Sequence, residues 1–490
     1  MKNKKWIYFA AILACFSPVI ISAQEASESS AGNEVMQLTP DKAVELAVKN
    51  NLGLESSRTA LETKKRASKY SWNQFIPQVS VSPGLNMNYP GSKMSGLVPL
   101  EQIPLNPLYT NPLTGDSLLP PGVPDFYGVV PYSMELPQWS LFASFQASLA
   151  LSAAMFENIR RLRLDYETGL ITYDKAKAQL ERDVLKAYYD ILLLQENIAL
   201  LLGSIANVER SVQIAQANYN AGLVPELTLL QARVQRENMR PMLYQAENGL
   251  VSLKELFSMQ LGLDSDTVFE LVPLSDTSDI VSLNVKEMIS KAAANKPDIL
   301  ELKQTILMLE SVRKTQINAL TPTLIFNWSH NSAYVLWKKD ERPENIDKWN
   351  NSGSFQILFR IQLDSLIPWS ANFQGIKNTE DQIKSANIGL AQMIRGTEIE
   401  VQNIVLSLDR THSNMQALAQ NVSLAEQSYR LMEQAYRAGL QDYFQVQNSE
   451  LSLRQARNNL LEQQFTYLKG LIDLEYAIGV PFGTLSKRSE

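Results

Sequence analysis

Apolar residues recur at spacings of three and four along two long stretches of the chain. This heptad pattern predicts helices that pack lengthwise against other helices. Proline is absent from 151–224 and from 369–480, so neither stretch contains a helix breaker. A helix over about 155–220 would be a rod of roughly 98 Å, far longer than a globular core requires. The seam positions of the first stretch are Val184, Ala187, Ile191, Leu194, Ile198, Leu201, Ile205, Val208, Val212, Ala215 and Tyr219.

The second stretch repeats this seam 217 residues later, and ten of its eleven positions are apolar. Those positions are Val401, Ile404, Leu408, Thr411, Met415, Leu418, Val422, Ala425, Tyr429, Met432 and Tyr436. Near the start of the chain, a shift of 245 residues places Leu38, Ala47, Asn50 and Pro77 on Leu283, Ala292, Asn295 and Pro322. The pattern indicates an internal duplication, with repeats at 38–270 and 283–480.

Each repeat opens with a helix start signal. The signals are Thr39 before Pro40 in the first repeat, and Asn284 with Glu287 three residues later, a capping-box pattern, in the second. A short helix should follow, break near Asn50 or Lys296-Pro297, and resume until Phe75 or Leu320. A further helix is expected over about 226–261, after the Gly222 turn. This helix and the one before the strands would stack end to end along the long rod.

Hydrophobicity changes to a period of two after each resumed helix, which indicates strands with one apolar and one polar face. The predicted strands are about 78–90 and 138–151 in the first repeat, and about 323–334 and 353–364 in the second. Ten of the 22 prolines lie between Pro90 and Pro137. We therefore expect 91–137 to be a long extracellular loop, because proline disfavours both helix and central strand.

The N-terminus has the features of a secretory signal peptide. Three lysines in Met1–Lys5 precede an apolar run that ends at Ser22-Ala23. We assign 1–23 to the signal peptide, 24–37 to a polar N-terminal segment and 481–490 to a C-terminal tail. Lipidation at Cys15, the only cysteine, is an open alternative. No other uncharged stretch approaches the roughly 18–20 residues that a membrane-spanning helix needs.

Charge and composition argue against several classes of function. The formal net charge is -6, and loss of the signal peptide with its three lysines makes it more negative, which disfavours nucleic acid as a partner. His330 and His412 are the only histidines, and no His, Cys or carboxylate cluster has metal-ligand spacing. We therefore expect no enzymatic activity, no metal and no cofactor. Carboxylates along the rods are interpreted as solvated helix faces.

Four two-faced strands of about ten residues suit either a lipid-spanning barrel or a small soluble sheet. The secretory signal, the absence of other spanning helices and the long rods favour the barrel. Open strand edges cannot lie in hydrocarbon, so four strands cannot span a membrane alone. Several chains must then share one barrel, and this reasoning leaves their number open above two. The alternative is a soluble periplasmic coiled-coil scaffold, in which the sheet would be water-soluble.

The mature chain resembles the TolC family of outer-membrane efflux proteins. The resemblance rests on Tyr219-Asn220-Ala221-Gly222-Leu223-Val224, on Tyr436-Arg437-Ala438-Gly439-Leu440, and on the duplication itself. It implies a mainly α-helical fold with membrane β-strands, in which a homotrimer forms a shared 12-stranded β-barrel and a periplasmic α-helical barrel. It further implies a passive duct for small molecules or proteins in a tripartite efflux or type I secretion system. A periplasmic adaptor and an inner-membrane pump would be its partners.

The resemblance also implies two sets of site residues at the hairpin tips. Adaptor docking would involve Gly222, Leu223, Val224, Gly439 and Leu440, and a periplasmic entrance would be lined or latched by Tyr436, Gln441, Asp442, Gln445 and Asn448. Gln445 and Asn448 stand where the family often has aspartates, and Gln441 replaces an arginine. An acidic cation-binding ring is therefore not expected. The alternative for Tyr436 is a purely structural role as the last apolar seam residue.

Overall fold

The computed structural model describes residues 36–89, 93–99, 129–135, 139–264, 267–273, 284–336, 349–362 and 367–485. The predicted signal peptide and Cys15 lie outside these ranges. In the first half the elements are β1 Met36–Leu38, α2 Pro40–Asn50, α3 Leu52–Lys69, a 3-10 turn Ser71–Phe75, β2 Gln78–Met87, β3 Lys93–Pro99, β4 Val129–Glu135, β5 Trp139–Leu151, α4 Ala153–Asn220, α5 Glu226–Leu261 and β6 Phe269–Leu271. In the second half they are α6 Val285–Asn295, α7 Pro297–Asn318, β7 Thr323–Leu336, β8 Trp349–Arg360, α8 Ala371–Arg437 and α9 Tyr443–Ile478.

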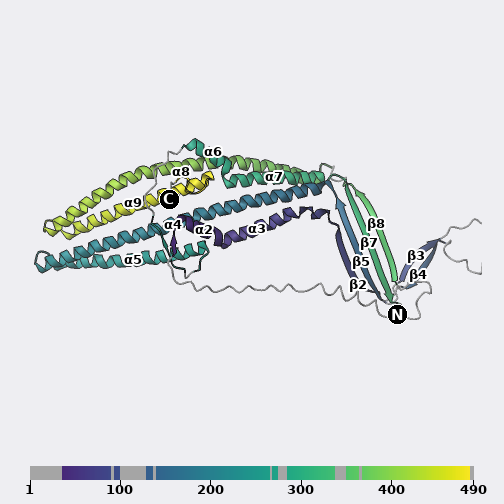
Figure 1. The fold of residues 1–490 in the computed structure, drawn as a ribbon, viewed down its shortest axis with the longest axis horizontal. Helices are drawn as coiled ribbons and strands as arrows, with labels where there is room; N and C mark the ends of the chain where they lie inside the picture. Colours follow the sequence, from purple (N-terminus) through teal and green to yellow (C-terminus); the bar gives the residue numbers. More distant parts are fainter. Residues whose placement is uncertain are drawn as a thin grey trace, which may run out of the picture.

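The molecule is an elongated helical bundle with a four-stranded sheet at one end (Figure 1). The rods α4 and α8 run from the sheet to the opposite end, where each turns back as α5 or α9. The helices α2 and α3, and likewise α6 and α7, occupy the part of each rod nearer the sheet. Each long rod is thus accompanied by shorter helices placed end to end, as the sequence predicted.

The strands form an antiparallel sheet in the order β2-β5-β7-β8. Even-numbered positions of β2 and β5 share one face, where Ser82 pairs with Ser144 and Gln78 with Ser148. The opposite face is apolar, and its side chains are exposed in the single chain. They include Val79, Val81, Leu85, Phe355, Ile357 and Phe359. β2 and β8 are the outer strands and find no further partner among the described residues.

Three strand boundaries differ from the sequence prediction. β2 ends at Met87 rather than near 90. β8 covers Trp349–Arg360 rather than 353–364, because β7 provides pairing partners only from Tyr334, opposite Trp349, to Thr323, opposite Arg360. The polar start of β8 carries no alternation, so hydrophobicity alone placed the strand too late.

The expected loop 91–137 is not wholly irregular. It contains β3 and β4, which form a separate antiparallel hairpin with Lys93 opposite Glu135 and Pro99 opposite Val129. The remaining loop residues lie outside the described ranges, as does 337–348 between β7 and β8. The high proline content concealed this hairpin because proline is usually excluded from paired strands.

The heptad seam is confirmed along both rods. Every predicted seam position of α8 is buried or half-buried, and so is every one of α4 except Tyr219, which is 39% exposed. By composition and length α4 could also cross a membrane, contrary to the sequence expectation, and 22% of the relevant window is buried in the single chain. Its residues Val184, Leu185 and Ile191 belong to the helical core, so α4 is a bundle helix.

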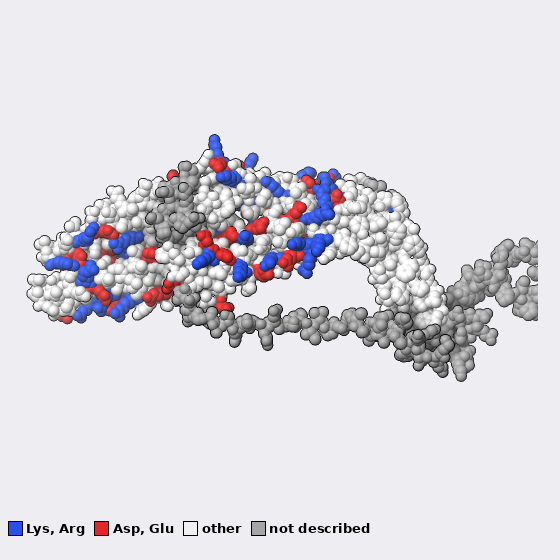
Figure 2. Space-filling model, in the orientation of Figure 1, with Lys and Arg blue, Asp and Glu red and all other residues white. Residues whose placement is uncertain are grey.

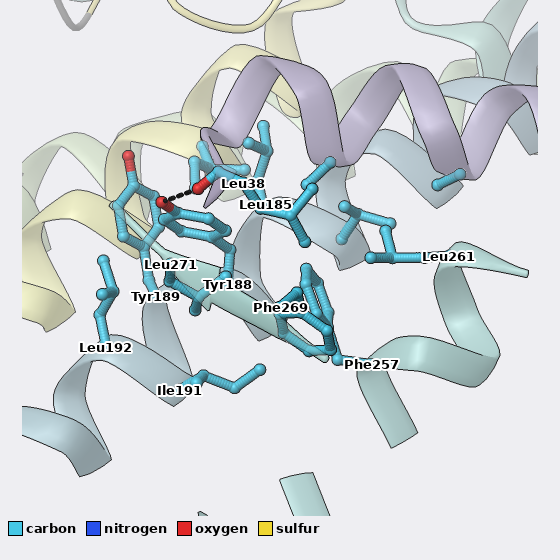
Figure 3. Packing of buried hydrophobic residues seen from close by; sticks show 14 of the residues in the cluster. Leu38, Leu185, Tyr188, Tyr189, Ile191, Leu192, Phe257, Leu261, Phe269 and Leu271 are labelled. Atoms are coloured by element: carbon cyan, nitrogen blue, oxygen red, sulfur yellow. Dashed lines mark hydrogen bonds between the residues drawn. The ribbon is translucent and has the colours of Figure 1, made fainter. Parts of the chain in front are cut away.

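Two hydrophobic clusters hold the helices together midway along the bundle. The first surrounds Tyr188 and joins α2, α4, α5 and α9 to the short parallel pair β1–β6 (Figure 3). The Tyr188 hydroxyl lies 3.0 Å from the Leu38 carbonyl oxygen and 2.8 Å from that of Val272. β1 begins at Met36, so the segment predicted as polar, 24–37, ends in a strand. The second cluster includes Ala292, Val401, Leu408 and Ile478 at the corresponding place in the other half.

The helix ends are fixed by local capping. Thr39 Oγ1 accepts from the Lys42 N–H at 3.4 Å, as the start signal predicted. Asn284 also precedes its helix, but its side chain makes no capping hydrogen bond, so the predicted capping box is not formed. At the other end, buried Glu475 accepts hydrogen bonds from the backbone N–H groups of Gly483 and Leu485. The start of the predicted tail is therefore held against α9.

Two glycines end α5 and α9. Each packs against the break between the two short helices that begin the same half of the chain. Gly262 after α5 and Gly479 after α9 have φ of 68° and 65°. A Cβ at Gly262 would lie 2.4 Å from the Asn50 carbonyl oxygen, and one at Gly479 would lie 2.7 Å from that of Asn295. Both positions therefore need glycine for conformation and for space.

We expect Gly262→Ala to destabilise the bundle by about 1–3 kcal/mol more than Gly222→Ala. Both substitutions carry the cost of a left-handed residue, about 1–2 kcal/mol, but only Gly262 also has the clash with Asn50. Gly222 has φ of 70° and nothing within 4 Å of its Cβ position. Thermal unfolding followed by circular dichroism measures the difference, and equal melting temperatures for the two variants would contradict the close approach.

Candidate functional site

The two hairpins end in turns of the same geometry. Gly222 and Gly439 adopt left-handed φ values of 70° and 73°. In the first turn the Leu223 N–H donates to the Asn218 carbonyl oxygen at 2.8 Å, and in the second the Leu440 N–H donates to that of Ala435 at 2.9 Å. In each turn the glycine N–H also donates to a tyrosine carbonyl oxygen three residues earlier. This pair of hydrogen bonds is a Schellman motif, which satisfies the last carbonyl groups of the helix.

The residues predicted for adaptor docking lie together in these turns. Leu223 is 72% exposed and Leu440 77% exposed, while the glycines beside them are exposed and Val224 is half-buried. Large apolar side chains at the ends of both rods have no internal packing role. They form a surface that a partner could cover.

A third hydrophobic cluster, here named the tip cluster, joins the two hairpins behind the turns. It contains Ala215 from α4, Leu229 and Ala232 from α5, Tyr429 and Tyr436 from α8, and Tyr443, Val446 and Leu453 from α9. The rings of Tyr436 and Tyr443 lie 6.0 Å apart at an angle of 57°. The second hairpin contributes the large side chains and the first mainly small ones.

Burial is the main cause of the raised pKa values of the tyrosines in the tip cluster. Burial, with a smaller contribution from the Glu433 and Glu450 carboxylates, raises the pKa of Tyr429 to about 12. Burial likewise raises the pKa of Tyr443 to about 12. It also raises the pKa of Tyr436, an effect that the Asn218 side chain partly opposes. The cluster is therefore neutral at physiological pH, and the Tyr429 hydroxyl has no hydrogen-bond partner among the described residues.

The residues predicted for the entrance occupy two different environments. Tyr436 is only 2% exposed and packs inside the tip cluster, whereas Gln441, Asp442, Gln445 and Asn448 are exposed on the turn and the first turns of α9. Asp442 caps α9 by accepting from the Gln445 N–H at 3.0 Å. The structure thus brings the four polar residues together on one short segment, with Tyr436 beneath them.

An open groove of about 810 Å³ runs between α5 and α9 next to the tips. Its exposed apolar residues are Leu227, Leu230, Val234 and Phe444. One hydrogen bond crosses the groove, from Gln447 Nε2 to Gln235 Oε1 at 2.8 Å. A groove that combines exposed apolar side chains with amide groups suits a packed protein segment.

Ion pairs between helices were missed from the sequence. Lys186 Nζ lies 2.8 Å from Asp473, and Lys469 Nζ lies 2.7 Å from Asp190, so two reciprocal pairs join α4 to α9. Lys175 binds two carboxylates of α7 at 2.7 and 2.9 Å. These carboxylates are partly exposed, as the sequence predicted, but they are also ion-paired across helices, which the sequence analysis did not predict. The spacing of Lys and Asp four residues apart on both α4 and α9 was the available signal.

The described part of the chain contains no group of three or more His, Cys, Asp or Glu residues that could hold a metal. His330 lies within β7, where its ring is 6.4 Å from that of Phe145. His412 lies on α8, 6.2 Å from the Tyr467 ring. The notable features are instead hairpin tips, a groove and a two-faced sheet, which are features of a channel component.

This arrangement, a sheet with one apolar and one polar face joined to long helical hairpins, is the architecture of an outer-membrane channel protein. The chain belongs to the outer membrane efflux protein family, whose model matches residues 131–253 and 288–480. The assignment to TolC-type proteins is therefore confirmed. As a member of this family, the protein is located in the outer membrane with a helical extension in the periplasm.

Solved structures with the same fold cover nearly the whole chain. CusC is 14% identical with a TM-score of 0.67, and the match covers 93% of this chain and 96% of that one. The CmeC outer membrane channel of Campylobacter jejuni is 14% identical with a TM-score of 0.63, covering 92% and 87%. VceC, an outer membrane protein of Vibrio cholerae, is 14% identical with a TM-score of 0.62, covering 90% and 96%. No sequence among the curated proteins matches this chain.

We expect the helical bundle to lose stability as the pH rises from about 10 to about 12. The pKa of Tyr429 and Tyr443 is near 10 when exposed and about 12 in the fold, so their stabilisation is complete below pH 10 and is lost as pH rises through the folded pKa. Tyr429→Phe combined with Tyr443→Phe should remove most of this loss. Melting temperatures from circular dichroism across this pH range provide the measurement.

Tyr219→Phe is the control, because Tyr219 lies near the same end of the bundle on α4 but is exposed. It should leave the alkaline loss unchanged. At neutral pH, Tyr429→Phe should be neutral or slightly stabilising, since it removes a buried hydroxyl without a partner. An alkaline transition that is identical in the wild type and the double variant would contradict the assignment.

Proposed function

We propose that this protein is the outer-membrane duct of an export system, in which three chains share one 12-stranded barrel and a periplasmic helical tube. The observation that carries the proposal is the four-stranded sheet, which has two distinct faces and unpaired outer strands. Unpaired backbone groups are too costly in hydrocarbon. Further copies must therefore supply the missing partners.

The strand order permits this closure. Each successive strand in β2-β5-β7-β8 is antiparallel to the one before, so β8 also runs opposite to β2. The β8 of one copy can consequently pair with the β2 of the next in the same antiparallel pattern. Two copies would give eight strands, a barrel filled by its own side chains. Three copies give room for a lumen lined by the serine, asparagine and glutamine side chains of the polar face.

The periplasmic end supports the role in export. The exposed Leu223 and Leu440, with the adjoining groove between α5 and α9, offer apolar surface to a periplasmic adaptor. The adaptor would connect the duct to an inner-membrane pump of a tripartite efflux or type I secretion system, and the pump would supply the energy. The cargo would be small molecules or proteins. A soluble scaffold is disfavoured because it would leave the apolar sheet face in water.

The proposal predicts opposite outcomes for two neighbouring substitutions in β8. Phe355 is on the apolar face and Ser354 on the polar face, near the middle of the strand. Phe355→Lys should cost about 2–4 kcal/mol by placing a charge in lipid, and should sharply reduce the trimer recovered from the outer-membrane fraction. Ser354→Lys should leave this yield close to wild type. Equal tolerance of both would reject a lipid-facing sheet, as would a monomeric native mass in detergent.

We further propose that Gln441, Asp442, Gln445 and Asn448 line the periplasmic entrance, with Tyr436 positioning their segment from within the tip cluster. The support is their exposure on one short segment above that cluster. Gln441→Ala combined with Gln445→Ala and Asn448→Ala should raise single-channel conductance in planar bilayers and increase susceptibility to large antibiotics. The conservative change Tyr436→Phe should alter neither. Unchanged conductance in the triple variant would reject the entrance role.

A further inference from the structure

Basic residues concentrate where the helices meet the sheet, whose described strands carry Arg360 as their one charged residue (Figure 2). Residues 63–77, which lead into β2, contain four basic residues and no acidic one, whereas residues 38–62 contain three basic and four acidic residues. The first turns of α4, 152–164, contain three basic and one acidic. The end of α7, 311–322, contains two basic and none acidic. In a chain of net charge -6 this is a local reversal of sign.

Five exposed residues of this region form what we call the basic collar. They are Lys65, Arg66, Lys69, Arg161 and Arg163. Two neighbouring carboxylates are already engaged, because Asp165 pairs with Lys64 at 3.0 Å and Glu157 with Arg160 at 3.9 Å. Among the described residues, no carboxylate lies within ion-pairing distance of a collar side chain. The collar charges are therefore available to an external anion.

A tier of exposed aromatic residues separates the basic collar from the strands. Trp72 is 56% exposed, Phe156 67% and Trp369 82%. Phe156 contacts Phe75 with ring centroids 5.8 Å apart. Aromatic side chains are enriched at the membrane–water interface, where one end is apolar and the other is wet. The strands would therefore lie in the hydrocarbon, the aromatic tier at the membrane interface, and the basic collar at the level of the lipid headgroups.

The distances agree with this order. Lys69 precedes the first residue of β2, Gln78, by nine residues, and the segment between them, a 3-10 turn followed by extended backbone, spans at most about 21 Å. The headgroup region extends roughly 5–8 Å beyond the hydrocarbon on each side. Long lysine and arginine side chains can extend back toward that level while their stems lie along apolar surface. The collar charges can thus reach the phosphate layer.

We propose that the basic collar binds the phosphates of anionic phospholipids in the periplasm-facing leaflet of the outer membrane. The inference rests on the proposed membrane insertion of the sheet. Contacts from several lysines and arginines would select phosphatidylglycerol over zwitterionic phosphatidylethanolamine. Binding would fix the depth and orientation of the rods, because the collar lies on α3 and α4 close to where they leave the sheet.

The test compares lipid selectivity in the full-length protein reconstituted into vesicles of phosphatidylethanolamine and phosphatidylglycerol. Spin-labelled forms of each lipid report which one is retained at the protein surface. The wild type should prefer phosphatidylglycerol several-fold at low salt, and the preference should decline at high salt. Lys65→Gln combined with Arg66→Gln and Lys69→Gln should bring the preference close to one.

The matched control is Lys42→Gln combined with Lys49→Gln and Arg58→Gln, which removes the same charge from α2 and α3 farther from the sheet. It should keep the wild-type preference. The proposal is overturned if the wild type shows no preference or if both triple variants behave alike. It is also overturned if the collar variant loses only co-sedimentation with peptidoglycan. Failure of the wild type to insert into vesicles at all would instead reject the proposed function.

Discussion

The unpaired backbone of β2 and β8 is the constraint on which the rest of the structure depends. A four-stranded sheet with one apolar face cannot be stable in water or alone in lipid, since water does not favour its face and lipid does not tolerate its edges. In the proposed duct, β-pairing between copies would remove these unpaired edges and leave the apolar face to lipid. The apolar face of the sheet, exposed in the single chain, would then lie against lipid.

The helical part follows from the same constraint. Only Ser152 separates β5 from α4, so the direction in which a strand leaves the membrane determines the direction of the rod. The rods continue unbroken to the hairpin tips, and the helix breaks are confined to the shorter helices beside them. There the glycines that end α5 and α9 pack on the carbonyls of Asn50 and Asn295. The shorter helices therefore complete the wall without interrupting the rods.

Sequence periodicity predicted those helices well whose residues repeat the same kind of contact with one neighbouring helix. The helices at 226–261 and along both rods follow from heptads and turn glycines, because each residue there reflects contacts with one neighbouring helix. Periodicity could not predict contacts between distant segments, such as the β1–β6 pair, the β3–β4 hairpin or the ion pairs of Lys186 and Lys469. The docking role of the tip glycines and the entrance role of the segment after Gly439 came only from the family resemblance. Their residue types alone specify a turn and a cap.

The two tips differ although their sequences align. Tyr219 and Tyr436 occupy corresponding positions, yet the first is 39% exposed and the second only 2%. The reason is their neighbours: α8 and α9 contribute three tyrosines to the tip cluster, whereas α4 and α5 contribute small or aliphatic residues such as Ala215 and Ala232. The two hairpins thus share one core, the tip cluster, whose large side chains come from the second hairpin. The exposed polar segment that follows Gly439 begins α9 and adjoins this cluster.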